Sequence, residues 1–254
     1  MSSRFPRVGR VFAVFLLSFG VCGSLSAQEA PDAEPPSIIG EGRLSFLMGV
    51  PLGEFRDNTD RLGFGGSVFG GLRIGASPVV FGVDLGFLVY GRSVDTVPFS
   101  STVGPRVQVE VVTTNNIVEP HLVLRLQPAD GQVRPYLDGL FGFKYLFTET
   151  RVRDEDRFDD EDIASTTNFQ DLAVSGGIGG GLDVRVYRGG PKQDVRTVSV
   201  HLGVQYLLGG RAEYLAEGPL EDTNGNGELD DSELNVQRST TPLLQPQIGA
   251  TLQF

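Results

Sequence analysis

The chain has 254 residues and a formal net charge of −11, with 34 glycines, 17 phenylalanines and a single cysteine. The negative balance argues against a nucleic-acid partner. One cysteine excludes an intrachain disulfide framework. After the first 27 residues no apolar pattern of period 3.6 reaches helix length, whereas period-2 alternation recurs, so the composition predicts strands.

Residues 1–27 have the features of an export signal. Arg4, Arg7 and Arg10 form a basic start, an apolar run covers 11–21, and small residues near Ala27 predict cleavage after that residue. The run is too short to span a bilayer as a helix. Cleavage removes three basic residues and the cysteine, which leaves 18 basic and 32 acidic residues, a net charge of −14 and no thiol for a metal site or a nucleophile.

Residues 28–37 form a polar, proline-rich linker that we expect to be disordered. From residue 38 to residue 254 apolar and polar residues alternate, as in strands with one apolar and one polar face. The clearest case places Val79, Phe81, Val83 and Leu85 on one face and Asp84 on the other. The eight predicted strands cover 44–52, 62–74, 79–92, 121–127, 133–147, 171–186, 198–206 and 243–254, with an irregularity near 113–116.

Short and long connections alternate between these strands. The short ones are 75–78, 128–131 and 188–194, and the long, polar ones are 54–61, 93–106, 151–167 and 211–238. Tight turns at one end and long loops at the other are typical of outer-membrane barrels. A membrane protein without helical spans must be a closed barrel. The sequence therefore predicts an all-β fold, an eight-stranded antiparallel up-and-down transmembrane β-barrel over 38–254.

Three stretches resemble small eight-stranded bacterial outer-membrane barrels. They are the glycine-rich opening strand that runs into 50–55 (VPLGEF), the 134–136 (RPY) entry to the fifth strand, and the closing strand that ends in Phe254. The resemblance implies a Gram-negative outer membrane, outer-membrane lipid as a partner, and recognition of the closing strand by the barrel-assembly machinery. Pro246 departs from a regular closing strand because it donates no ladder hydrogen bond.

Charged residues on the second face must point inward in a membrane barrel, because a cation on the lipid side costs roughly 2–4 kcal/mol at the midplane. The predicted interior charges are Arg43, Arg73, Asp84, Arg92, Arg125, Arg134, Asp138, Lys144, Asp171, Asp183 and Arg185. Because both signs are interleaved, they favour an ion-pair network that fills the barrel over a narrow conduction or ligand path.

The two histidines, His121 and His201, fall on the same predicted inner face. Outer-membrane lipid A deacylases use a His-x-Ser arrangement, but here the second residue after each histidine is Val123 or Gly203. No carboxylate partner is identifiable from the pattern. We therefore expect both histidines to fill space, and we expect no enzyme.

The last outer loop contains the one specific motif, residues 222–233, which resembles the twelve-residue EF-hand calcium loop. The predicted Ca²⁺ ligands are Asp222, Asn224, Asn226, Glu228 through its carbonyl, Asp230 and Glu233. Gly227 occupies the position of the sharp turn, but no helix pattern flanks the loop. The affinity expected for such an extracellular site is about 0.1–1 mM. The alternative is an acidic, hydrophilic loop that holds no metal.

A second acidic loop, 154–162, carries seven carboxylates and is a weaker candidate for divalent cations. Taken together, the sequence predicts a non-enzymatic outer-membrane barrel with a structural or surface-binding role and a calcium-binding outer loop. Two alternatives stay open: a narrow channel or porin for small hydrophilic solutes, and a secreted soluble calcium-binding β-barrel.

Overall fold

The computed structural model describes residues 38–59, 61–98, 108–154, 164–190, 194–215 and 236–254. All of them belong to one compact unit of the chain. The predicted export signal and linker, the core of the acidic loop at 155–162 and the whole calcium motif lie outside the described residues.

Eight strands form a closed barrel in which every neighbouring pair is antiparallel. They are β1 (Ile38–Pro51), β2 (Gly63–Ile74), β3 (Val79–Pro98), β4 (Gln108–Leu126), β5 (Val133–Asp154), β6 (Ala164–Arg188), β7 (Thr197–Gly209) and β10 (Leu243–Gln253). The strands follow one another around the barrel in chain order, and β10 closes it by pairing with β1 in the register Gly42↔Leu252. The predicted up-and-down barrel is confirmed.

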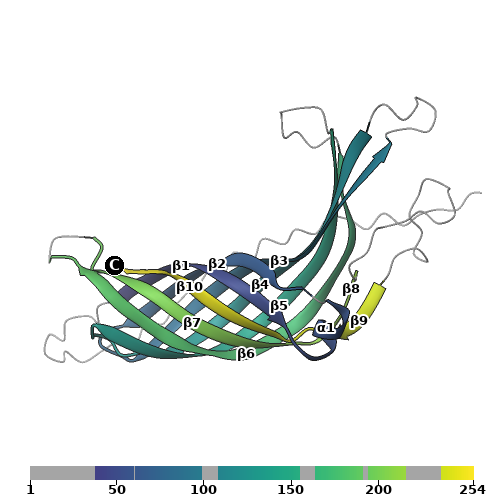
Figure 1. Cartoon of the computed structure of the whole chain (residues 1–254). Helices are drawn as coiled ribbons and strands as arrows, with labels where there is room; N and C mark the ends of the chain where they lie inside the picture. The colour runs from purple at the N-terminus through teal and green to yellow at the C-terminus, as the bar shows by residue number, and fades with distance from the viewer. Residues whose placement is uncertain (1–37, 60, 99–107, 155–163, 191–193, 216–235) are drawn as a thin grey trace, which may run out of the picture. The chain divides into compact units, whose positions relative to one another are not determined.

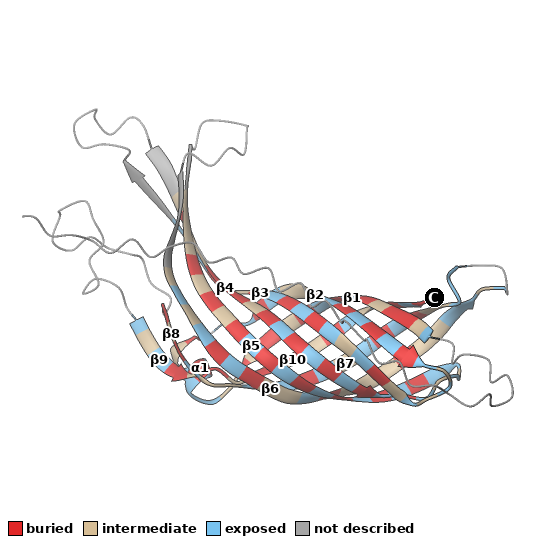
Figure 2. Ribbon diagram, turned by 180° about the vertical axis from the view of Figure 1, so that it is seen from behind, coloured by how far each residue is buried: buried red, intermediate tan, exposed pale blue. Residues whose placement is uncertain are grey.

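Strand alternation divides the barrel into an apolar outer face and a polar inner face. Leu44, Phe81 and Leu122 are 67%, 61% and 64% exposed, whereas Arg73 and Arg125 are fully buried. Figure 2 shows the result as a checkerboard of buried and exposed residues on the side of the barrel that faces the viewer. An apolar outer belt around a charged interior is the arrangement of a membrane-spanning barrel.

Three strands, β3, β5 and β6, are longer than the sequence predicts. They have 20, 22 and 25 residues, and together with β4, of 19 residues, their outer ends continue past the last pairs of β2 and β7 (Figure 1). They include residues 93–98, 151–154 and 164–167, which the sequence pattern assigns to the loops at 93–106 and 151–167. The predicted irregularity near 113–116 is present, but the extra residue is Tyr90 on β3, where the pairing shifts between Val89 and Gly91.

The two ends of the barrel differ as the connection lengths predict. The short turns and the C-terminus lie at one end. The opposite end carries a helix, α1 (Gly53–Asn58), and a two-stranded sheet of β8 (Arg211–Leu215) and β9 (Val236–Thr240). The sequence predicted neither. Within the described residues, no helix has the length and apolar character to cross a membrane.

Candidate functional site

The barrel interior is filled by a charge-balanced set of buried side chains. Among the described residues, five buried basic groups face five buried acidic ones: Arg43, Arg73, Arg125, Arg134 and Lys144 against Glu41, Asp84, Glu119, Asp138 and Asp183. An eight-stranded barrel is just wide enough for side chains to fill it. The interior therefore has the organisation of a packed polar core.

Arg125 forms a bidentate ion pair in this core. Its Nε and Nη2 atoms each donate to one carboxylate oxygen of Asp138, both at 2.8 Å. The guanidinium also lies over the ring of Tyr136 at 4.0 Å and that of Phe69 at 4.9 Å. The bidentate ion pair balances the charge of the arginine and the two rings cover its guanidinium, while Nη1 has no hydrogen-bond partner in the described residues.

Glu41 forms a second centre nearer the short turns. Its Oε1 accepts hydrogen bonds from Arg73 at 3.1 Å and from Gln253 at 2.5 Å, and Arg134 approaches it at 3.8 Å. Near the opposite end, Glu119 accepts from Gln245 and lies 3.7 Å from Lys144. Neither glutamate is among the predicted interior charges, although each keeps the two-residue step of the neighbouring interior residues.

Three of the predicted interior charges lie elsewhere. Arg92 is exposed, because the extra residue Tyr90 reverses the alternation beyond it. Asp171 is partly exposed at the outer end, where it accepts a hydrogen bond from the backbone N–H of Glu213 at 2.7 Å. Arg185 lies at the short-turn end and pairs with an aspartate of the neighbouring turn. The other eight predicted charges are buried inside the barrel.

Both histidines lie inside the barrel in hydrogen-bonded positions. His201 pairs through Nδ1 with Asp183 at 2.8 Å, a carboxylate partner that the sequence analysis did not find, and through Nε2 with the Tyr136 hydroxyl at 3.1 Å. His121 pairs with the hydroxyl of Ser175 at 2.9 Å. His201, which pairs with a carboxylate, thus has Tyr136 as its other partner. His121, which pairs with Ser175, has no described hydrogen bond to a carboxylate. The described contacts do not join serine, histidine and carboxylate into one catalytic chain.

An apolar cap covers the outer mouth of the barrel. Phe55 of α1 is fully buried; it packs edge-on against Tyr214 of β8 at 5.1 Å and at a tilt against Tyr90 of β3 at 5.6 Å. The rest of this buried cluster is Leu47, Leu88, Ile117, Leu146, Ala173, Ala212 and Leu243. Beside this cluster, Lys144 donates to the carbonyl of Thr241, in the link between β9 and β10, at 2.6 Å.

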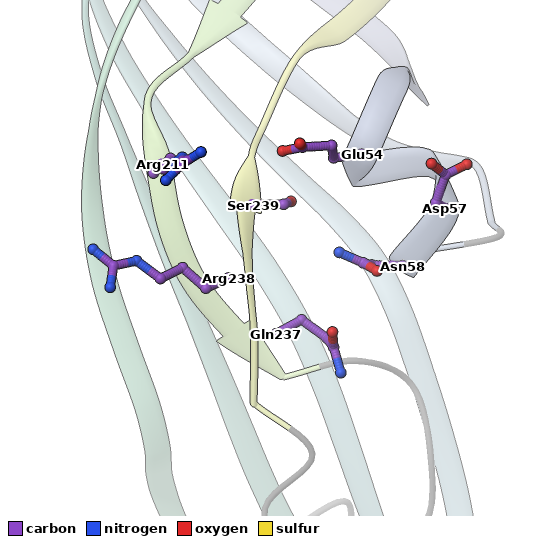
Figure 3. Close-up of a pocket in the computed structure, with 7 residues that line it drawn as sticks. All are labelled: Glu54, Asp57, Asn58, Arg211, Gln237, Arg238 and Ser239. Atoms are coloured by element: carbon purple, nitrogen blue, oxygen red, sulfur yellow. The ribbon is translucent and has the colours of Figure 1, made fainter.

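A polar pocket of about 470 Å³ lies on the solvent side of this cap (Figure 3). Glu54, Asp57 and Asn58 of α1 form one wall. The strands of the small sheet form the other and contribute Arg211, Gln237, Arg238 and Ser239. The Glu54 carboxylate accepts from the backbone N–H of Thr240 at 3.3 Å and from its hydroxyl at 3.2 Å, which ties the helix to β9.

The predicted calcium motif belongs to the connection between β8 and β9, the two strands that line this pocket. All six of its predicted ligands lie outside the described residues. Among the residues that the structure describes, no group of three histidine, cysteine or acidic side chains is placed to hold a metal ion.

A second pocket, of about 550 Å³, lies at the opposite end, between the turn that joins β4 to β5 and the connection from β6 to β7. Arg185, Arg188 and Arg196 line it together with Asp130. Asp130 accepts from the backbone N–H of Gly131 at 2.8 Å and from Arg185 at 2.5 Å, and these bonds hold the pKa of its carboxyl below the usual value. Asp130 is therefore ionised at neutral pH.

No family model matches this chain, and no curated protein matches it. Similar solved structures include Neisserial surface protein A (10% identity, 85% of this chain and 95% of that one, TM-score 0.35). They also include a major outer membrane protein from Thermus thermophilus (15% identity, 85% and 99%, TM-score 0.40) and Ail, the attachment invasion locus protein of Yersinia pestis (12% identity, 87% and 99%, TM-score 0.32). Because these scores are low, the fold described above rests on the register of the barrel strands.

Proposed function

We propose that this chain is a non-enzymatic outer-membrane barrel whose structural or surface-binding role is exerted at its outer end. The observation that carries the proposal is the pairing of an apolar outer belt with a filled interior. Leu44, Phe81 and Leu122 turn their side chains outward, where lipid would solvate them. The buried charges inside bind one another, so what remains available to a partner lies at the two ends.

The filled interior argues against a channel for hydrophilic solutes. Arg125, Asp138 and Tyr136 occupy the lumen with mutual contacts of 2.8–4.0 Å, and the apolar cap covers the outer mouth. Purified protein in planar bilayers is expected to give no reproducible conductance steps. Conductance steps of constant size, whose number rises with the amount of protein, would contradict the structural role and indicate a narrow pore.

We include in the proposal a calcium ion bound by the loop at 222–233. The ligands are the six named from the motif, Asp222, Asn224, Asn226, Glu228, Asp230 and Glu233. Support comes from the hairpin that flanks the loop, since Leu215 of β8 pairs with Val236 of β9. Ends that are already held together reduce the entropy that a loop must lose when it wraps an ion.

Calorimetric titration of the refolded barrel with CaCl₂ tests this site. Wild-type protein is expected to bind one ion with a Kd of about 0.1–1 mM. Glu233→Ala removes the bidentate ligand and is expected to abolish that heat, whereas Glu161→Ala, in the other acidic loop, serves as a matched control and leaves it unchanged. Equal loss in the two variants would show general attraction of cations by acidic loops and would overturn the specific site.

The proposed partners of the belt are outer-membrane lipid and, through β10, the barrel-assembly machinery. Phe254 is 56% exposed and exchanges backbone hydrogen bonds of 3.0 Å with Gly40 in both directions, so the last residue presents its ring outward from a paired strand. Deletion of Phe254 is expected to lower the amount of barrel assembled in cells while leaving refolding in detergent intact. Detergent-free solubility of the mature chain would contradict the membrane location and favour a soluble barrel.

A further inference from the structure

The short-turn end of the barrel has a local charge opposite to that of the whole chain. Arg185, Arg188 and Arg196 line the pocket there, and Asp130 is the single acidic residue among the lining side chains. These four groups carry a net charge of +2, whereas the chain carries −11. A basic pocket on an acidic protein concentrates anions at one place on its surface.

The arginines are held in place by the strand ends around them. The backbone N–H of Arg185 donates to the carbonyl of Gln132 at 2.8 Å, which joins β6 to the preceding turn. Arg196 donates through its N–H to Gln253 and accepts from Gly189, both at 2.8 Å. The pocket wall is therefore fixed by backbone hydrogen bonds across the connection from β6 to β7.

Asp130 leaves the positive charge only partly neutralised. Its carboxylate contacts Arg185 at 2.5 Å and reaches Arg188 at 3.8 Å, so a single negative charge serves two guanidinium groups. Arg134 is buried further inside the barrel, at 2% exposure, and its terminal nitrogens lie 3.8 Å from Glu41 and from Asp183, so it adds no net charge to the pocket.

We propose that this pocket binds a phosphate group, as the free anion or as the headgroup of an anionic phospholipid in the adjacent leaflet. Guanidinium forks match the geometry of phosphate oxygens and form strong charge-assisted bonds with them. A cavity of about 550 Å³ accepts a phosphate with a small substituent such as glycerol. In this arrangement Asp130 competes with the ligand for Arg185 and keeps that side chain in position when the pocket is free.

The competition predicts variants of opposite sign. In a detergent that contains no phosphate, inorganic phosphate is expected to bind saturably to the full mature barrel. The double variant Arg185→Gln/Arg188→Gln weakens binding about tenfold or more, because two charge-assisted contacts are lost. Asp130→Asn strengthens binding several-fold, because it frees Arg185 and removes a negative charge. Arg92→Gln, an exposed arginine at the other end, leaves the affinity unchanged.

Phosphorus NMR or calorimetry measures these affinities, with circular dichroism to show that each variant is folded. A second titration uses short-chain phosphatidylglycerol in the same micelles. Binding of the lipid alone identifies the leaflet as the source, and equal binding of free phosphate identifies a soluble anion. Absence of saturable binding in both titrations, or an Asp130→Asn variant that binds more weakly than wild type, would overturn the proposal and leave the cluster as a purely structural set of ion pairs.

Discussion

Arg125 shows at the scale of one residue how a full charge is kept inside a barrel. Its bidentate bond to Asp138 is 2.8 Å long at both nitrogens, and neither side chain is exposed beyond 1%. A buried pair of this kind need not stabilise the fold relative to apolar residues of the same size. Removal of one partner, however, leaves an uncompensated charge.

We therefore expect Asp138→Ala to lower the free energy of unfolding by about 3–5 kcal/mol. The double variant Arg125→Met/Asp138→Leu is expected to recover most of that loss, because it removes both charges and keeps the volume. The chain has no tryptophan, so urea unfolding is best followed by circular dichroism. A double variant as unstable as the single one would show that the arginine stabilises the barrel through its contacts with Phe69 and Tyr136.

Two strand glycines offer a matched test of backbone crowding inside the barrel. A Cβ atom at Gly142 of β5 would lie 2.0 Å from the carbonyl oxygen of Pro120 and 2.8 Å from the Cα of His121. At Gly70 of β2, on the outer face, a Cβ atom would meet nothing within 4 Å. Gly142→Ala is expected to cost about 1–3 kcal/mol of unfolding free energy, and Gly70→Ala to stay within about 0.5 kcal/mol of wild type. Equal effects of the two substitutions would contradict the crowding.

At the scale of the element, strand alternation was predictable wherever the two faces meet different surroundings. Each residue of β3 from Val79 to Val89 faces either the outer surface or the packed interior, and the alternation of its apolar residues indicates which. Beyond Tyr90 both faces lie outside the belt, the constraint weakens, and the pattern no longer marks where the strand ends. Arg92 was misassigned because the extra residue Tyr90 reverses the alternation beyond it.

The cap was unpredictable for a different reason. α1 has six residues, and β8 and β9 have five each, too short for any periodic signal. What stabilises them is tertiary contact with Tyr90, Ile117 and Leu146, which lie far away in the chain. The carboxylate partner of His201 was missed in the same way, because strand register, which the sequence does not encode locally, places Asp183 beside it.

The cap supplies a prediction at this scale. Phe55→Ala removes a fully buried ring that contacts Tyr90 and Tyr214, and we expect a cost of about 3–5 kcal/mol to the cap. Because the barrel strands pair without it, the loss is expected to remain local. Hydrogen exchange measured by mass spectrometry should show reduced protection in 211–215 and 236–240 and unchanged protection in β7 and β10. Uniform loss over all strands would mean that cap and barrel unfold as one unit.

At the scale of the whole molecule, the fold follows from one requirement, that every backbone group and every charge be satisfied away from lipid. Closure of β1 on β10 leaves no edge strand in the barrel wall, and the interior holds five basic and five acidic groups. That architecture could be read from the sequence because it repeats over eight strands. The position of each end pocket depends on connections that occur only once in the chain, so it could not be predicted from the sequence.

The surroundings of the belt can be tested by placing the same charge at two outward positions. Leu122 of β4 is 64% exposed in the middle of the belt, and Val94 of β3 is 47% exposed beyond the bulge, outside the barrel wall. If lipid surrounds the belt, Leu122→Arg costs roughly 2–4 kcal/mol of unfolding free energy in phospholipid vesicles, whereas Val94→Arg costs at most about 1 kcal/mol. In a soluble barrel both side chains would meet water, and the two substitutions would have small and similar effects. Reversible urea unfolding from vesicles distinguishes these outcomes. The two variants add the same charge, so the difference between their unfolding free energies reports what surrounds each position on the outer face.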